Sequence, residues 1–181
     1  MKAFIFLAEG FEEIEAVATT DILLRGGLEV NRVSITGKLQ VTGAHGIPVT
    51  AGLLFENADF SSAAILILPG GMPGAANLNA HQGLKNLLKQ QAAAGGKIAA
   101  ICAAPLVLGG LDLLQGKKAT AYPGYEDTLK GAELELKGVV KDGNILTGRG
   151  PGFSFDFGLA IIEDLLGKAK ADEVAAGLLL K

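Results

Sequence analysis

Cys102 is the only cysteine of the 181-residue chain, and its surroundings favour nucleophilic chemistry. It follows residues 97–101, a short apolar run typical of a buried strand, and precedes Pro105, which suits the first turn of a helix. A thiol at such a turn lies at the positive end of a helix dipole, which predicts a pKa below the value of about 8.5 for a free thiol. Ala100 and Ala104 loosely match the glycines of the G-x-S-x-G nucleophile elbow. The alternative is that Cys102 is only a small buried hydrophobic residue.

Glu15 is the candidate acid–base partner of this thiol. It comes one residue after Ile14 on a predicted helix, which must pack against a sheet. A carboxyl group buried beside a thiolate should have a raised pKa, and when protonated it can hydrogen-bond the sulfur and act as an acid or base. We interpret the neighbouring Glu12 and Glu13 as solvated charges that the helix dipole favours.

Gly70 and Gly71 follow another predicted strand, and their backbone amides could form an oxyanion hole for the thiol chemistry. The alternative is a simple strand-ending turn. His45 and His81 have no recognisable partner in the sequence, and we interpret both as surface residues. The spacing of the two histidines and the cysteine matches no metal-ligand pattern, and we expect no metal or organic cofactor.

Composition narrows the class of protein. Hydrophobic residues make up 49% of the chain, which excludes disorder. A net charge of −3 without a basic patch argues against nucleic acid or an anionic membrane as a partner. No apolar run reaches the roughly 18 residues needed to span a bilayer, and the first apolar run ends at Glu9, too early for a signal peptide. A lone cysteine fits the reducing cytoplasm. We therefore expect one cytoplasmic domain over residues 1–181.

Strands and helices alternate along the chain. Strands are predicted over residues 2–8, 28–35, 63–68, 97–101 and 117–121, with a β excursion or hairpin within 37–54 and a hairpin of 138–141 with 145–147. Helices are predicted over residues 13–26, 153–166 and 169–179. Another is predicted from residue 79 or 81 to 94, and a further one follows the cysteine and ends at residue 108. The first helix should have an apolar side made of Ile14, Val17, Ala18, Ile22 and Leu24.

This alternation predicts an α/β fold with an open, mostly parallel sheet and helices on both faces. Ligands of such sheets bind outside the carboxyl ends of the strands. The candidate groups each follow a predicted strand, so we expect them to converge at that edge: residues 9–15, Gly70 and Gly71, Cys102, Tyr122, and Arg149 with Gly150.

The chain resembles the ThiJ/PfpI family, in the branch of the parkinsonism-associated deglycase. The resemblance covers essentially the whole chain and rests on LAEGFEEIEAV (7–17), LPGG (68–71), AAICAAP (99–105) and TGRGPG (147–152). It implies a flavodoxin-like three-layer sandwich that forms a homodimer. It also implies that Cys102 is the nucleophile, that Glu15 is its partner, and that the Gly71 and Ala103 amides line the site.

The chain departs from the family pattern at two positions. Tyr122 stands where animal members carry a histidine, and tyrosine is a poor base near neutrality because its pKa is about 10. Ala103 replaces the histidine that the protease-like branch places after the cysteine. His45, in VTGAH (41–45), aligns with an arginine near the dimer-related site of relatives, and the loop with Arg149 and Gly150 is expected to shape the same region along with Gly70.

The resemblance implies a glyoxalase-like or deglycase-like enzyme that acts on small reactive aldehydes such as methylglyoxal, or on their glycated adducts. The residues themselves indicate only the nucleophile and its acid partner. The alternative is a redox-sensing or chaperone protein of the oxidative stress response, since an exposed cysteine of low pKa oxidises readily. An amidase or peptidase is disfavoured by Ala103.

Overall fold

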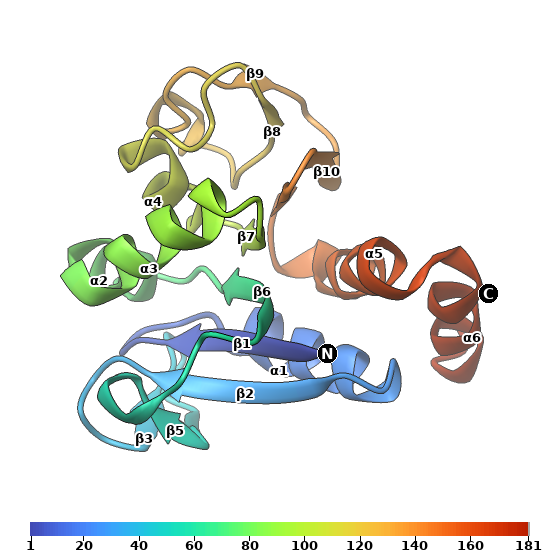
Figure 1. Cartoon of the computed structure of the whole chain (residues 1–181), viewed down its shortest axis with the longest axis horizontal. Helices are drawn as coiled ribbons and strands as arrows, with labels where there is room; N and C mark the ends of the chain where they lie inside the picture. The colour runs from blue at the N-terminus through green and yellow to red at the C-terminus, as the bar shows by residue number, and fades with distance from the viewer. Residues whose placement is uncertain (181) are drawn as a thin grey trace.

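A seven-stranded sheet forms the centre of the computed structural model, which describes residues 1–180 (Figure 1). The strand order is β10-β11-β7-β6-β1-β2-β5, and only β10 and β11 pair antiparallel. The strands are β1 (Lys2–Leu7), β2 (Glu29–Ser34), β5 (Leu53–Leu54), β6 (Ala63–Leu68), β7 (Lys97–Ile101), β10 (Val139–Asp142) and β11 (Ile145–Gly148). The prediction of a mostly parallel sheet is confirmed.

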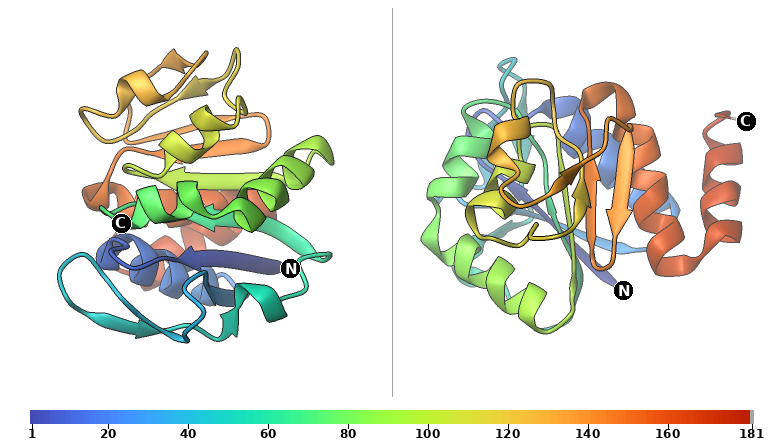
Figure 2. Two further views of the ribbon diagram at one scale, coloured as in Figure 1. Left: turned by 90° about the vertical axis from the view of Figure 1, so that its left-hand side faces the viewer. Right: turned by 90° about the horizontal axis from the view of Figure 1, so that it is seen from above.

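Helices cover both faces of this sheet and complete a flavodoxin-like three-layer arrangement (Figure 2). One face carries α1 (Glu13–Arg25), α5 (Ser154–Leu166) and α6 (Lys168–Gly177), and the other carries α2 (Gly74–Ala80), α3 (Gln82–Ala93) and α4 (Pro105–Gly110). Successive side chains of a strand point to opposite faces. Ile5 therefore packs in the core under α1 and α5, whereas Phe4 and Phe6 pack in the core under α2, α3 and α4. Within residues 1–180, no helix is long and apolar enough to cross a membrane.

Two small sheets and three single 3-10 turns lie outside the central sheet. The predicted excursion is a hairpin of β3 (Gln40–Thr42) and β4 (Pro48–Thr50). The strand predicted over 117–121 is reduced to β8 (Lys118–Ala119), which pairs with β9 (Glu133–Leu134) and not with the central sheet. The 3-10 turns are Phe55–Asn57, Glu126–Thr128 and Pro151–Phe153. The prediction missed α2, because its first residue, Gly74, and the preceding Pro73 are turn signals.

Helix α1 buries Glu15, as expected, but most of its predicted apolar side faces outward. Ile14, Val17 and Leu24 are 55%, 49% and 50% exposed, whereas Glu15 is completely buried. Ile22 alone of the larger predicted apolar residues packs in the core. The side of the helix that carries Glu15 turns inward, where the Gly70 amide compensates the buried carboxyl group by donating to Glu15 Oε2. An apolar stripe is thereby left on the outside of the protein.

Candidate active site

Cys102 lies at the sharp turn between β7 and α4, as predicted. Its φ of 65° is in the left-handed region that residues other than glycine rarely adopt. Two backbone hydrogen bonds hold this conformation: the Cys102 amide donates to the Gly148 carbonyl (2.9 Å), and the Tyr122 amide donates to the Cys102 carbonyl (2.8 Å). Such strain persists where the surrounding structure over-determines it, which is typical of functional sites. The side chain is 8% exposed and opens into a pocket.

Glu15 reaches Cys102 from the first turn of α1. Its Oε2 accepts a 2.7 Å hydrogen bond from the Gly70 amide, and the carboxyl group also hydrogen-bonds the Cys102 thiol. Its Oε1 has no hydrogen-bond partner among residues 1–180. Burial raises the pKa of Glu15 to about 7, against an ordinary value of 4.5. The carboxyl group is therefore poised to gain or lose a proton near neutral pH.

The Cys102 thiol holds its proton more tightly than the sequence predicts. Burial raises its pKa to about 12, and the charge of Glu15 and the hydrogen bond to it add to the rise. Hydrogen bonds from the Gly71 and Ala103 amides act in the opposite direction. The prediction of a pKa below that of a free thiol is therefore wrong beside an ionised Glu15, because desolvation and a like charge outweigh the dipole of the short helix α4. A reaction at the sulfur therefore needs a base for the thiol proton, and the Glu15 carboxyl group lies beside it.

Gly70 and Gly71 belong to the site for steric reasons. A Cβ atom on Gly70 would lie 2.7 Å from Cys102 Cβ and 3.0 Å from both the Ala103 amide nitrogen and Glu15 Oε2. Gly71 has a φ of 83°, and a Cβ atom there would lie 2.4 Å from the Glu12 amide nitrogen. Only glycine allows the backbone to pass this close to the Cys102–Glu15 pair at position 70, and to the backbone of residues 10–12 at position 71.

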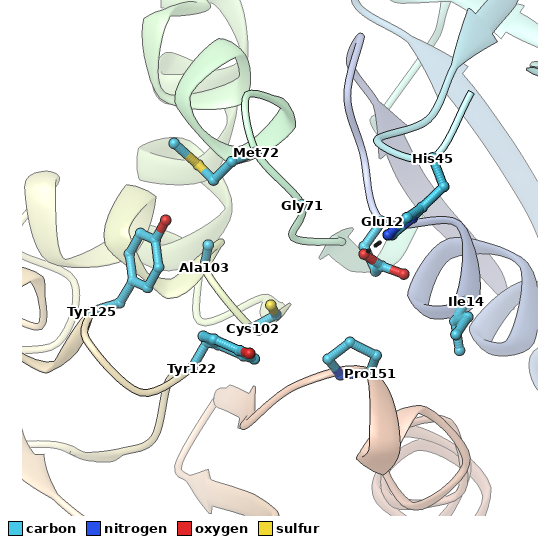
Figure 3. Close-up of a pocket in the computed structure, with 10 residues that line it drawn as sticks. All are labelled: Glu12, Ile14, His45, Gly71, Met72, Cys102, Ala103, Tyr122, Tyr125 and Pro151. Carbon is cyan, nitrogen blue, oxygen red and sulfur yellow. Dashed lines mark ion pairs between the residues drawn. The ribbon is translucent and has the colours of Figure 1, made fainter. Parts of the chain in front are cut away.

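A pocket of about 440 Å³ opens above Cys102 (Figure 3). Five of the predicted site residues line it: His45, Gly71, Cys102, Ala103 and Tyr122. Prediction missed five others: Glu12, Ile14, Met72, Tyr125 and Pro151. Four of these, all but Tyr125, lie within or beside the sequence segments that carry the family resemblance, but nothing local marked them individually as lining residues.

The remaining predicted site residues lie outside the pocket lining. Glu15 and Gly70 lie behind Cys102, as their contacts with it show. Gly150 supports the Tyr122 ring, since a Cβ atom there would lie 3.0 Å from Tyr122 Cδ2. Arg149 is bound elsewhere: its amide donates to the Gly138 carbonyl, and its guanidinium donates to the Leu136 carbonyl at 3.4 Å.

Known proteins share the sequence pattern and the fold of this chain. The model of the DJ-1/PfpI family matches residues 1–164. This chain belongs to the DJ-1/PfpI family. It is 37% identical to a solved structure described as "Toxoplasma gondii DJ-1, oxidized", with a TM-score of 0.95 over 98% of this chain and 97% of that one.

Two relatives of the DJ-1/PfpI family differ in how much of their length this chain matches. Protein DJ-1 homolog A of Arabidopsis thaliana is 42% identical over 97% of this chain, which spans only 45% of that protein. The glutathione-independent glyoxalase DJR-1.2 of Caenorhabditis elegans is 33% identical over 95% of this chain and 92% of its own length. The family membership inferred from the sequence is thus confirmed.

Glu12 and Glu13 are buried in this DJ-1/PfpI chain, so the prediction that they are solvated is wrong. Glu13 Oε1 accepts hydrogen bonds from the amides of His45 (2.7 Å) and Ile47 (3.3 Å), and Glu13 Oε2 lies 2.8 Å from His45 Nδ1. Burial opposes ionisation of Glu13, but these hydrogen bonds prevail and lower its pKa. The hydrogen bond to Glu13 raises the pKa of the exposed His45.

A cation could be coordinated by three side chains at this edge of the pocket: Glu12, Glu13 and His45. Each offers a ligand atom, and these atoms all lie within 4.8 Å of one another. His45 Nδ1 lies 3.8 Å from Glu12 Oε2, so the three side chains already neutralise part of one another's charge when the histidine is protonated. Sequence spacing missed this group because the histidine comes from the loop between β3 and β4.

Glu15 should make the stability of this DJ-1/PfpI protein fall as pH rises from 4.5 through 7. In that window the folded state binds a proton that the unfolded chain has lost, since the folded pKa is raised from 4.5 to about 7. The free energy of unfolding of the wild type should fall by about 3 kcal/mol over this pH range. Glu15→Gln should not show this fall. Urea unfolding at about pH 5 and about pH 8, at equal protein concentration, measures it. An equal free-energy difference between the two proteins at both pH values would contradict the prediction.

Proposed function

We propose that this chain is a glyoxalase-like or deglycase-like enzyme that uses Cys102 and Glu15 to convert 2-oxoaldehydes such as methylglyoxal, or their adducts, to 2-hydroxy acids. The observation that supports it most is the burial of the Glu15 carboxyl group, with a pKa of about 7, beside the single cysteine, since both lie within 3.0 Å of the point that a Cβ atom on Gly70 would occupy. A base with a pKa near the working pH is the most effective proton shuttle. The relative named as a glutathione-independent glyoxalase supports the same reaction class.

In the first step, the Cys102 sulfur forms a bond to the aldehyde carbon as Glu15 takes the thiol proton. The aldehyde oxygen becomes an oxyanion, which the Gly71 and Ala103 amides are close enough to stabilise because both already hydrogen-bond the sulfur. The oxyanion then takes the proton from Glu15, which leaves a neutral hemithioacetal and restores the carboxylate.

In the next steps, Glu15 removes the hydrogen of the former aldehyde carbon as a proton and delivers it to the adjacent carbonyl carbon, while a proton moves between the two oxygens. The first carbon is thereby oxidised and the second reduced, so the reaction needs no external oxidant. The product is a thioester of the 2-hydroxy acid. Water hydrolyses it, the carbon–sulfur bond breaks, and a proton returns to the sulfur.

Turnover of methylglyoxal by the purified protein in the absence of glutathione tests this function. We expect loss of methylglyoxal to equal formation of lactate, both followed by NMR. For the deglycase variant of the reaction, a preformed adduct of methylglyoxal with N-acetylcysteine should give lactate faster than the adduct releases free aldehyde without protein. The absence of lactate from both substrates would refute the proposal.

A redox-sensing role remains the second candidate, and the opening of Cys102 into the pocket favours it. The raised pKa of the thiol works against it, because the thiolate is the form that oxidises readily. Stoichiometric formation of a sulfinate by low peroxide, without aldehyde turnover, would favour the sensor over the enzyme. Either role suits the reducing cytoplasm, which we propose as the location because the only cysteine is free.

We also propose that a second copy of the chain covers the exposed stripe of α1. Val17 and Leu24 are half-exposed, and together with Pro48 and Val49 of β4 they line a groove of about 400 Å³. Apolar residues gathered on one helix face mark interaction surfaces more often than scattered ones do.

The wild type should therefore sediment at micromolar concentration as a species of twice the 18.5 kDa chain mass. Val17→Asp should shift it to the monomer, because a charge would be buried in the interface without a partner. Leu136→Asp is the matched control, since Leu136 is exposed and lies outside α1. A wild type that sediments only at 18.5 kDa would contradict the homodimer.

A further inference from the structure

The pocket above Cys102 has one apolar side and one acidic side. In Figure 3, Met72 and Tyr125 lie beyond Ala103 on one side of the sulfur, whereas Glu12 and His45 lie on the other. Tyr122 lies next to Cys102 between the two sides. Within residues 1–180, no lysine or arginine lines the pocket. Tyr122 and Tyr125 form an aromatic wall of the pocket. A substrate bound at the sulfur can therefore extend toward this aromatic wall without meeting a charge.

The aromatic wall is held in place before any ligand binds. The Tyr125 amide donates to the Tyr122 carbonyl (3.0 Å), and the Thr128 hydroxyl donates to the Tyr125 carbonyl (2.6 Å). The Tyr125 side chain also packs against buried residues of the core. Tyr122 is tied to the nucleophile itself through its amide and the Cys102 carbonyl. Binding against the packed Tyr125 ring therefore needs little ordering, which favours affinity.

The pocket is larger than methylglyoxal requires. Its volume of about 440 Å³ falls in the range that holds drug-sized ligands, about 300–1,000 Å³. Methylglyoxal carries only a methyl group beyond its two carbonyl groups, so it would leave the space between Met72 and Tyr125 unfilled. An aryl substituent would fill it with ring–ring contacts to Tyr125 and a sulfur–aromatic contact to Met72.

We infer that this pocket selects uncharged 2-oxoaldehydes with an aryl substituent, and that Tyr125 is the residue that determines this specificity. The inference rests on the proposed function, which it narrows to a substrate class. The aldehyde carbon sits at Cys102, and the aryl group lies against Tyr125 and Met72. Substituents that carry a carboxylate are disfavoured, because the Glu12 carboxylate lies across the same pocket and no lysine or arginine among residues 1–180 lines it.

The ratio of kcat/KM for phenylglyoxal to that for methylglyoxal tests the inference. We expect a ratio of at least about tenfold in the wild type, the low end of what one apolar pocket contact discriminates. Tyr125→Ala should lower kcat/KM for phenylglyoxal by about tenfold, mainly through KM, and change that for methylglyoxal by less than about twofold. Tyr125→Phe keeps the ring and should keep the ratio. Phe155→Ala, an exposed aromatic outside the pocket lining, is the control for unspecific effects.

A second measurement keeps the inference separate from the proposed reaction. The unreactive ketols 2-hydroxyacetophenone and hydroxyacetone differ only in a phenyl or methyl group, and each can be tested for protection of Cys102 from iodoacetamide. We expect the phenyl ketol to protect at about tenfold lower concentration, and Tyr125→Ala to remove this difference. If neither aldehyde is turned over but this preference holds, the proposed function fails and the pocket specificity stands. Equal protection by both ketols, or equal loss of both aldehyde activities in Tyr125→Ala, would overturn the inference.

Discussion

Cys102→Ala should reduce glutathione-independent turnover of methylglyoxal to the rate measured without protein. The proposed reaction passes through a covalent bond to the Cys102 sulfur, so no later step can occur without it. Removal of a covalent nucleophile typically lowers kcat by roughly 10⁴-fold or more. The variant should remain folded, because the substitution removes only the sulfur atom of a small, buried side chain and introduces no new heavy atom into its surroundings.

Three measurements separate loss of chemistry from loss of structure. The alanine variant should keep the wild-type circular dichroism spectrum and bind 2-hydroxyacetophenone, while it loses lactate formation. Cys102→Ser should be nearly as inactive, since a base with the pKa of Glu15, about 7, is poorly matched to an alcohol. An alanine variant that keeps a tenth or more of the wild-type rate would show that Cys102 is not the nucleophile.

The position of Cys102 could be predicted because the signals are local. A buried strand, a cysteine and a proline follow one another within residues 97–105, and the strand-to-helix turn needs no information from elsewhere in the chain. The alternation of strands and helices likewise predicts the parallel sheet, whose register sets the end of β6 beside the end of β7. That register brings Gly70 to the cysteine.

The raised pKa of Glu15 follows from its expected burial beside the thiol, as predicted. The electrostatics of Glu12, Glu13 and Cys102 could not be predicted, because they depend on partners that are distant in sequence. Glu13 is buried only because the amides of His45 and Ile47 arrive from the β3–β4 hairpin to compensate its charge. The same reasoning applies to the thiol of Cys102. The local helix dipole favours a thiolate, but the burial and the Glu15 charge that raise the pKa come from packing between α1 and β7.

Two residues of the proposed aryl site, Met72 and Tyr125, were missed for a similar reason. Met72 and Tyr125 come from different loops, after β6 and after β8, and neither has a local signal that distinguishes it from a surface residue. Hydrophobic periodicity shows that one side of α1 is apolar, but it cannot show whether the chain itself or a second molecule covers that side.

Glu15→Gln should change the two activities of Cys102 in opposite directions. Turnover of methylglyoxal should fall by roughly 10²–10⁴-fold, because glutamine cannot accept the thiol proton or move it between carbons. The thiol pKa should fall from its value of about 12, because the charge that opposes the thiolate has been removed while the amides of Gly71 and Ala103 remain. Alkylation by iodoacetamide should therefore begin at lower pH than in the wild type. A residue that only supports the fold would not produce a more reactive thiol and a slower enzyme together.

Asp21→Asn is the matched control for this experiment. It removes one carboxylate from the same helix, but Asp21 is exposed and pairs with Arg25 away from the pocket. It should leave both the turnover and the pH dependence of alkylation within about twofold of the wild type, as surface substitutions generally do. Glu15→Asp keeps the charge but shortens the side chain, so it should keep the high thiol pKa and still lose turnover through misplacement of the base. If Glu15→Gln lowers neither the turnover nor the pH at which alkylation begins, the carboxyl group is not the proton carrier, and the mechanism that depends on it is wrong.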